Sequence, residues 1–101
     1  MKLRDLAHAR AGDKGDISNI AVIVHDPADF DRVAAFLTAE RVKAHFGPMV
    51  RGLVQRYALP HLGALNFVMQ GALGGGVTRS LSLDAHGKSL SSSLLELDLP
   101  S

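Results

Sequence analysis

The first thirty residues contain two apolar stretches separated by a charged, glycine-rich segment. Residues 2–10 (KLRDLAHAR) mix alternating and apolar character, which predicts a strand that breaks at Gly12. Residues 17–25 (ISNIAVIVH) carry consecutive β-branched side chains with no polar face in their second half. Such a run is typical of a strand covered on both sides, so we expect it at the centre of a sheet.

Residues 26–48 have a helical pattern. Asp26 is a suitable N-cap, and the following large apolar residues have the i, i+3, i+4, i+7 spacing of one helix face. The phase then slips before Val42 and Phe46, and Thr38 can cap a second segment. The pattern predicts two short helices or one kinked helix, ended by a Gly-Pro pair. The residues of the first apolar stripe are Phe30, Val33, Ala34 and Leu37.

The second half of the chain predicts further strands and one more helix. Residues 49–60 alternate loosely and indicate a third strand, whereas residues 63–76 indicate a short helix ended by three glycines. Residues 77–84 and 89–99 flank a tight AHGK turn and predict a hairpin, with 91–93 as a solvent-facing serine run. The residues expected to share faces are Leu65, Val68, Met69 and Leu73 in the helix, and Val77, Leu81, Leu83, Leu95, Leu97 and Leu99 in the hairpin.

These elements predict one domain over residues 1–101, because no linker or repeat divides the chain. The order is strand, strand, helix, strand, helix, strand, strand. Each helix has a single apolar stripe, so both are expected on one face of an antiparallel or mixed sheet. The fold class is therefore α+β, with two layers.

Composition excludes several classes of protein. Apolar residues make up 47% and charged residues 21% of the chain, which argues against disorder. The formal net charge of +1 lacks the basic stripe that a nucleic-acid binder needs. No apolar run approaches the roughly 20 residues of a membrane span, and cysteine is absent. We expect a soluble cytoplasmic protein with no nucleic-acid or membrane partner.

The segment RAGDKGD (10–16) is the first candidate site, with Gly12 to Asp16 predicted as a loop between two strands. Its glycines let backbone N–H groups converge on an anion, and its cations add charge. The two carboxylates would repel a phosphate and fit better as partners of those cations or as acceptors for a ligand hydroxyl or amide. A charged turn with weak surface salt bridges explains the segment equally well. The candidate ligand-binding residues here are Arg10, Asp13, Lys14, Gly15 and Asp16.

Other candidates lie farther along the chain. Asn19 is a polar residue in an apolar strand, and Asn66 is predicted to open the second helix; each has either a ligand or a bracing role. Three consecutive glycines suggest a close backbone approach, or they simply end one element, and Arg79 can bind a carboxylate bidentately. If the glycine run and the charged segment are neighbours, a ligand site is favoured. The candidates here are Asn19, Asn66, Gly74, Gly75, Gly76 and Arg79.

The sequence contains no self-sufficient catalytic set. Its five histidines have no metal-ligand spacing, so neither a metal nor another cofactor is expected. His8 shares a predicted strand face with Arg10 and is the one candidate general base, with a structural role as the alternative.

Three stretches together resemble the small AtuA-like domain: AHARAGDKGDISNIAVI (7–23), LTAERVKAHF (37–46) and LGALNFVMQGALGGGVTRSLSLDAHGK (62–88). That domain occurs fused to acyclic terpene utilization proteins and as a free-standing protein. The resemblance implies a ferredoxin-like sandwich with two helices on one face, a larger AtuA-type partner and, in some relatives, catabolism of terpenoid or branched acyl compounds. Ala11 departs from the family pattern, which more often has Ser there.

Two functions follow as hypotheses, and whether the domain is an enzyme stays open. The first is an accessory module that assembles with itself and with a larger AtuA-type subunit. The alternative is a binding protein or small enzyme for an acyl-CoA thioester or other anionic metabolite. A purely structural scaffold is a third reading. A homo-oligomer is expected in either case, because a small sheet exposes its edges and one face.

Overall fold

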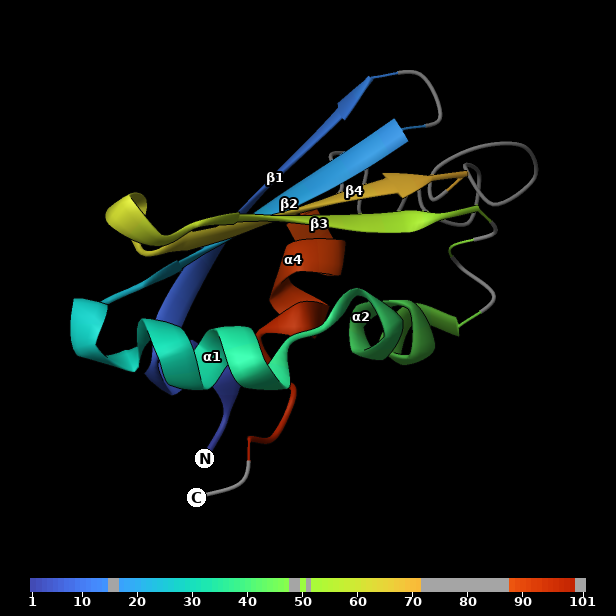
Figure 1. Cartoon of the computed structure of the whole chain (residues 1–101). Helices are drawn as coiled ribbons and strands as arrows, with labels where there is room; N and C mark the ends of the chain where they lie inside the picture. The colour runs from blue at the N-terminus through green and yellow to red at the C-terminus, as the bar shows by residue number, and fades with distance from the viewer. Residues whose placement is uncertain (15–16, 48–49, 51, 72–87, 100–101) are drawn as a thin grey trace.

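The protein is a two-layer α+β fold, as predicted. A computed structural model describes residues 1–14, 17–47, 50, 52–71 and 88–99. Figure 1 shows one sheet with the described helices on a single side of it. Its four strands are all antiparallel, in the order β1-β2-β4-β3. The elements are η1 (Leu3–Asp5), β1 (Ala7–Lys14), β2 (Ile17–Val24), η2 (Pro27–Asp29), α1 (Phe30–Phe36), α2 (Ala39–Phe46), β3 (Val54–Leu59), η4 (Pro60–Leu62), β4 (Ala64–Gln70) and α4 (Lys88–Leu94).

The first two strands form a hairpin whose extent differs from the prediction. β1 begins only at Ala7, because Leu3–Asp5 forms a 3-10 turn, and it continues through Gly12 to Lys14. Gly12 therefore does not break the strand: it pairs with Asn19 of β2 within a continuous ladder. Most of the predicted loop is strand, and only residues 15–16, outside the described part, separate β1 from β2.

β2 is an internal strand, as predicted, but only one of its faces is fully buried. Ser18, Ile20, Val22 and Val24 face the helices and are buried. On the opposite face Ile17 is 43% exposed and the next three alternate residues are half-buried. The predicted cover on both sides is therefore wrong for the described part of the chain, since its helices all lie on one side.

Local capping sets the helical segment, and the prediction of two short helices is confirmed. The Asp26 carboxylate accepts a hydrogen bond from the Ala28 amide and opens η2. Thr38 then interrupts the helix, and its hydroxyl accepts from the Arg41 amide to cap α2. α2 ends at Gly47, whose φ of 58° lies in the region that favours glycine.

The predicted helix over residues 63–76 is wrong in its described part, which is the strand β4 (Ala64–Gln70). Leu65, Phe67 and Met69 alternate as buried residues, a period of two rather than 3.6. The segment pairs with β2 on one side and β3 on the other, which satisfies its backbone groups in both directions. β3 itself confirms the third predicted strand in a shorter form.

The second arm of the predicted C-terminal hairpin is also wrong. Residues 88–94 form α4, while residues 77–84 lie outside the described part. The serine run is helical: Ser91 is buried, and Ser92 and Ser93 are exposed. Ser91 and Leu94 have the i, i+3 spacing of one helix face, and that face packs toward the sheet. The segment after α4 is tied to the N-terminus, since the Leu3 amide donates to the Leu97 carbonyl at 2.8 Å.

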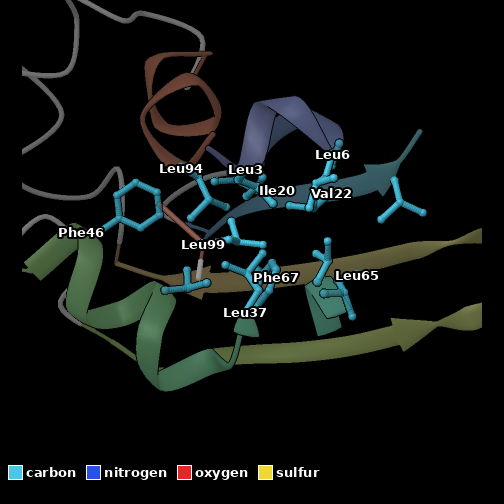
Figure 2. Packing of buried hydrophobic residues seen from close by; sticks show 14 of the residues in the cluster. Leu3, Leu6, Ile20, Val22, Leu37, Phe46, Leu65, Phe67, Leu94 and Leu99 are labelled. Carbon is cyan, nitrogen blue, oxygen red and sulfur yellow. The ribbon is translucent and has the colours of Figure 1, made fainter. Parts of the chain in front are cut away.

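The core lies between the sheet and the helices (Figure 2). Phe67 is fully buried at the middle of β4, with Leu37 of the helical layer and Leu94 of α4 against the same cluster. Burying each such side chain contributes roughly 1.5–3 kcal/mol, so this one-sided core accounts for most of the favourable free energy of folding. None of the described helices is long and apolar enough to cross a membrane.

Candidate functional site

The end of the β1–β2 hairpin is held by contacts that converge on Gly12. On the helix side, the buried Ser18 hydroxyl donates a hydrogen bond to the Gly12 carbonyl at 3.2 Å. On the other side, Asn19 lies directly opposite Gly12 in the ladder. A Cβ atom added to Gly12 would lie 2.9 Å from the Asn19 Oδ1 atom, so a larger residue there would force the Asn19 amide to shift.

Asn19 also connects the hairpin to the centre of the sheet. Its Nδ2 donates to the Oδ1 of Asn66, on β4, at 3.3 Å. The two asparagines singled out separately in the sequence are therefore partners, 47 positions apart. The expectation that Asn66 opens a helix is wrong, because it lies within a strand and pairs with Ala21. Both side chains are half-buried, and their hydrogen bond ties β2 to β4.

His8 and Arg10 lie on the same face of β1 as Gly12, as predicted from their spacing. The His8 ring stacks on the exposed ring of His25, with centroids 5.6 Å apart and planes 25° apart. In the part of the chain that the structure describes, no three His, Cys, Asp or Glu side chains are grouped to hold a metal ion.

The strand register assembles a larger surface around this cluster, which we call the open face. It is the side of the sheet away from α1, α2 and α4 (Figure 1). It combines His8 and Arg10 on β1, aliphatic and amide side chains on β2 and β4, and the half-exposed Tyr57 on β3. The described residues of the open face are His8, Arg10, Gly12, Ile17, Asn19, Ala21, Ile23, Gln55, Tyr57, Leu59, Ala64, Asn66, Val68 and Gln70.

A separate hollow of about 440 Å³ lies between β1 and α4. It is lined by Ala9, Arg10, Ala11, Ser91 and Ser92, so a guanidinium and two hydroxyl-bearing residues border an apolar floor. Its volume is within the range of small-molecule sites. Arg10, at the outer strand of the sheet, thus borders both the hollow and the open face.

The structure brings together two of the residues singled out from the sequence, because Asn19 is hydrogen-bonded to Asn66. Arg10 lies on the same face of the sheet, in the cross-strand row that contains Asn66. Asp13 and Lys14 end β1, with side chains outside the described part. The proximity of the glycine run to the charged segment stays a prediction. The candidates that lie wholly outside the described residues are Gly15, Asp16, Gly74, Gly75, Gly76 and Arg79.

The contribution of β3 to this surface was not predicted from the sequence. Gln55, Tyr57 and Leu59 alternate along β3, and their partners on β4 are Val68, Asn66 and Ala64. The alternation in VQRYAL (54–59) indicates that Gln55, Tyr57 and Leu59 share one face of a strand. It does not place Tyr57 beside Asn66 unless residues 64–70 are also known to form a strand.

Comparison with known proteins supplies a family. The family model described as "AtuA ferredoxin-like domain" matches residues 1–100. No curated protein and no solved structure matches the chain.

Proposed function

The chain belongs to the AtuA ferredoxin-like domain family, and we propose that it is an accessory module that assembles with a larger AtuA-type subunit. In that assembly it contributes the charged hairpin end, residues 10–16, to a site that the larger subunit completes. The observation that carries this proposal is the support of Gly12 by β2, through the Ser18 hydroxyl and the paired Asn19, which is itself hydrogen-bonded to Asn66 of β4.

The support matters because a docking element binds more tightly when it is ordered in advance. The Ser18 hydroxyl and the pairing with β2 fix the Gly12 backbone, so this position is defined before any partner binds. A segment that is held before it meets its partner loses less conformational entropy on association. The described residues around it supply cations and amides but no nucleophile with an adjacent base, which suits a contributor to a shared site.

A second candidate function is the binding of a small anionic metabolite, such as an acyl-CoA thioester. The hollow between β1 and α4 favours it, because Arg10 can pair with an anionic group beside the apolar Ala9 and Ala11. In this case the ligand would bind without any larger subunit.

Co-expression with a larger AtuA-type subunit, followed by native mass spectrometry, tests the leading proposal. We expect a complex that Asp13→Ala weakens at least tenfold. Asp31→Ala is the matched control, because Asp31 is an exposed carboxylate on α1, in the opposite layer of the fold. A folded wild-type protein that forms no complex would overturn the proposal.

Thermal unfolding against acyl-CoA thioesters and small carboxylates tests the second function in the same preparation. A ligand at 100 times its dissociation constant stabilises a protein by about 2.7 kcal/mol, which raises the midpoint of a domain of this size by ~10 °C or more. The rise should disappear in Arg10→Ala. A panel that leaves the wild-type midpoint unchanged would remove the metabolite proposal and leave the assembly proposal in place.

A further inference from the structure

The open face has the composition of an interface rather than of a solvated surface. Among its described side chains Arg10 is the one with a permanent charge, and no carboxylate is present. Tyr57 is 50% exposed and Ile17 43% exposed on it. Depletion of charge together with exposed Tyr and Arg is characteristic of the centre of protein–protein interfaces.

The size of the open face approaches that of a small protein interface. Four strands about 4.8 Å apart and about seven residues at ~3.4 Å each give a patch of roughly 19 by 24 Å. Summed over the two partners, the flat projected area is about 900 Å². The side chains add surface to this value because they project from the sheet. The area is therefore close to the ~1,200 Å² at which specific interfaces begin.

We propose that a second copy of this chain covers the open face, related by a two-fold axis that runs parallel to the strands. The cross-strand register supports this arrangement. On the open face the four strands contribute three complete rows: His8–Ile23–Ala64–Leu59, Arg10–Ala21–Asn66–Tyr57 and Gly12–Asn19–Val68–Gln55.

A two-fold axis parallel to the strands places each row of one copy against the same row of the second copy, with the order of the four strands reversed. Arg10 then meets the partner's Tyr57, a cation on an aromatic face. Three further pairs match a larger with a smaller residue: Ile23 meets the partner's Ala64, Asn66 meets the partner's Ala21, and Gln55 meets the partner's Gly12. The remaining pairs set His8 against the partner's Leu59 and Asn19 against the partner's Val68. Each row thus meets its own copy, as an isologous interface requires.

The distance between the two Arg10 guanidinium groups favours an axis parallel to the strands over one perpendicular to them. A two-fold axis perpendicular to the strands through the same row would lay Arg10 on the partner's Arg10. The axis parallel to the strands places the two guanidinium groups on opposite sides of the dimer, about three strand spacings or ~14 Å apart laterally. That separation exceeds the screening length of about 8 Å at physiological salt. The self-complementary arrangement therefore avoids repulsion between like charges.

The end of the proposed docking element lies outside the complete rows of the dimer. Arg10 and Gly12 belong to both surfaces, whereas the Lys14–Ile17 pair lies beyond the row of Gly12, at one end of the strands. Self-association is therefore measured on the isolated chain, and binding of the larger subunit on the co-expressed complex.

Analytical ultracentrifugation of the isolated chain tests the inference. We expect a particle of twice the 10.7 kDa chain mass at micromolar concentration. Ala21→Arg places a charge at the centre of the open face and should weaken the dimer at least tenfold while the circular dichroism spectrum is unchanged. Leu62→Arg is the control, because Leu62 is 60% exposed and lies in η4, off the open face. A monomeric wild-type protein would overturn the inference, even if it bound the larger subunit.

Cysteine cross-linking tests the direction of the axis, since the natural chain contains no cysteine. A mixture of Arg10→Cys and Tyr57→Cys chains should react with a short bismaleimide to give a covalent dimer, and neither variant should do so alone. Cross-linking of Arg10→Cys with itself would overturn the proposed axis. Loss of binding to the larger subunit in a protein that still dimerises would contradict the proposed function and leave this inference intact.

Discussion

Gly12→Ala is the sharpest test of how the hairpin end is supported. The new Cβ atom would lie 2.9 Å from the Asn19 Oδ1 atom, closer than such atoms approach, so the Asn19 amide must move. Moving it breaks the 3.3 Å hydrogen bond to Asn66, which costs about 1 kcal/mol, and displaces the side chain from its rotamer, which costs a further ~0.5–1.5 kcal/mol.

A second effect of the same substitution acts in the opposite direction. Replacing glycine by alanine reduces the freedom of the unfolded chain and stabilises by about 0.4–1 kcal/mol where the backbone permits it. The net expectation is a destabilisation of about 1 kcal/mol, equivalent to a fall of roughly 4–8 °C in the midpoint of a domain of this size.

A double-mutant cycle with Asn19→Ala isolates the contact. Without the Asn19 amide nothing opposes the new methyl group, so Gly12→Ala should become neutral or stabilising in that background. The expected coupling free energy is about 1–2 kcal/mol, measured by urea denaturation at fixed protein concentration. An equal cost of Gly12→Ala in both backgrounds would refute the account, because the cost would then arise from the backbone and not from Asn19.

Three further substitutions test the packing and capping of the fold by urea denaturation. Phe67→Ala removes a fully buried ring and should cost about 3–5 kcal/mol, whereas Leu62→Ala, at a 60% exposed position, should stay within ~0.5 kcal/mol; similar losses would contradict the one-sided core. Thr38→Ala should cost about 1 kcal/mol and Thr38→Ser almost nothing, since the cap needs only the hydroxyl. Arg56→Met should cost about 1 kcal/mol, because the guanidinium donates to two carbonyl groups at the end of α1, and an unchanged midpoint would refute that role.

The elements that the sequence predicted correctly depend on local interactions. Asp26 and Thr38 cap their helices through amides two and three residues away, so their effect is contained in a few neighbouring positions. The β-branched residues of β2 and the glycine at the end of α2 are equally local signals. Such features predicted the helical segment, the internal strand and the fold class.

The segments whose structure was predicted wrongly have apolar residues that fit both the helical period of 3.6 and the strand period of two. Leu65, Val68 and Met69 suit a helix, while Leu65, Phe67 and Met69 suit a strand. Residues 64–70 form a strand rather than a helix because β2 and β3 lie on either side and supply hydrogen-bond partners for the whole segment. Residues 88–94 are the reverse case: a segment predicted as a strand is a helix whose buried side packs on the core.

The candidate site shows the same division between local pattern and tertiary structure. The sequence by itself identified Asn19 and Asn66 as polar residues that need partners, and it placed Arg10 and His8 on one face by their spacing. Only the strand register, fixed by which face of each strand is buried, brought the two asparagines within 3.3 Å and placed Tyr57 in the same row as Arg10. A one-residue shift of β4 would have turned Asn66 into the core, and for this reason the surface depends on long-range packing that no local pattern encodes.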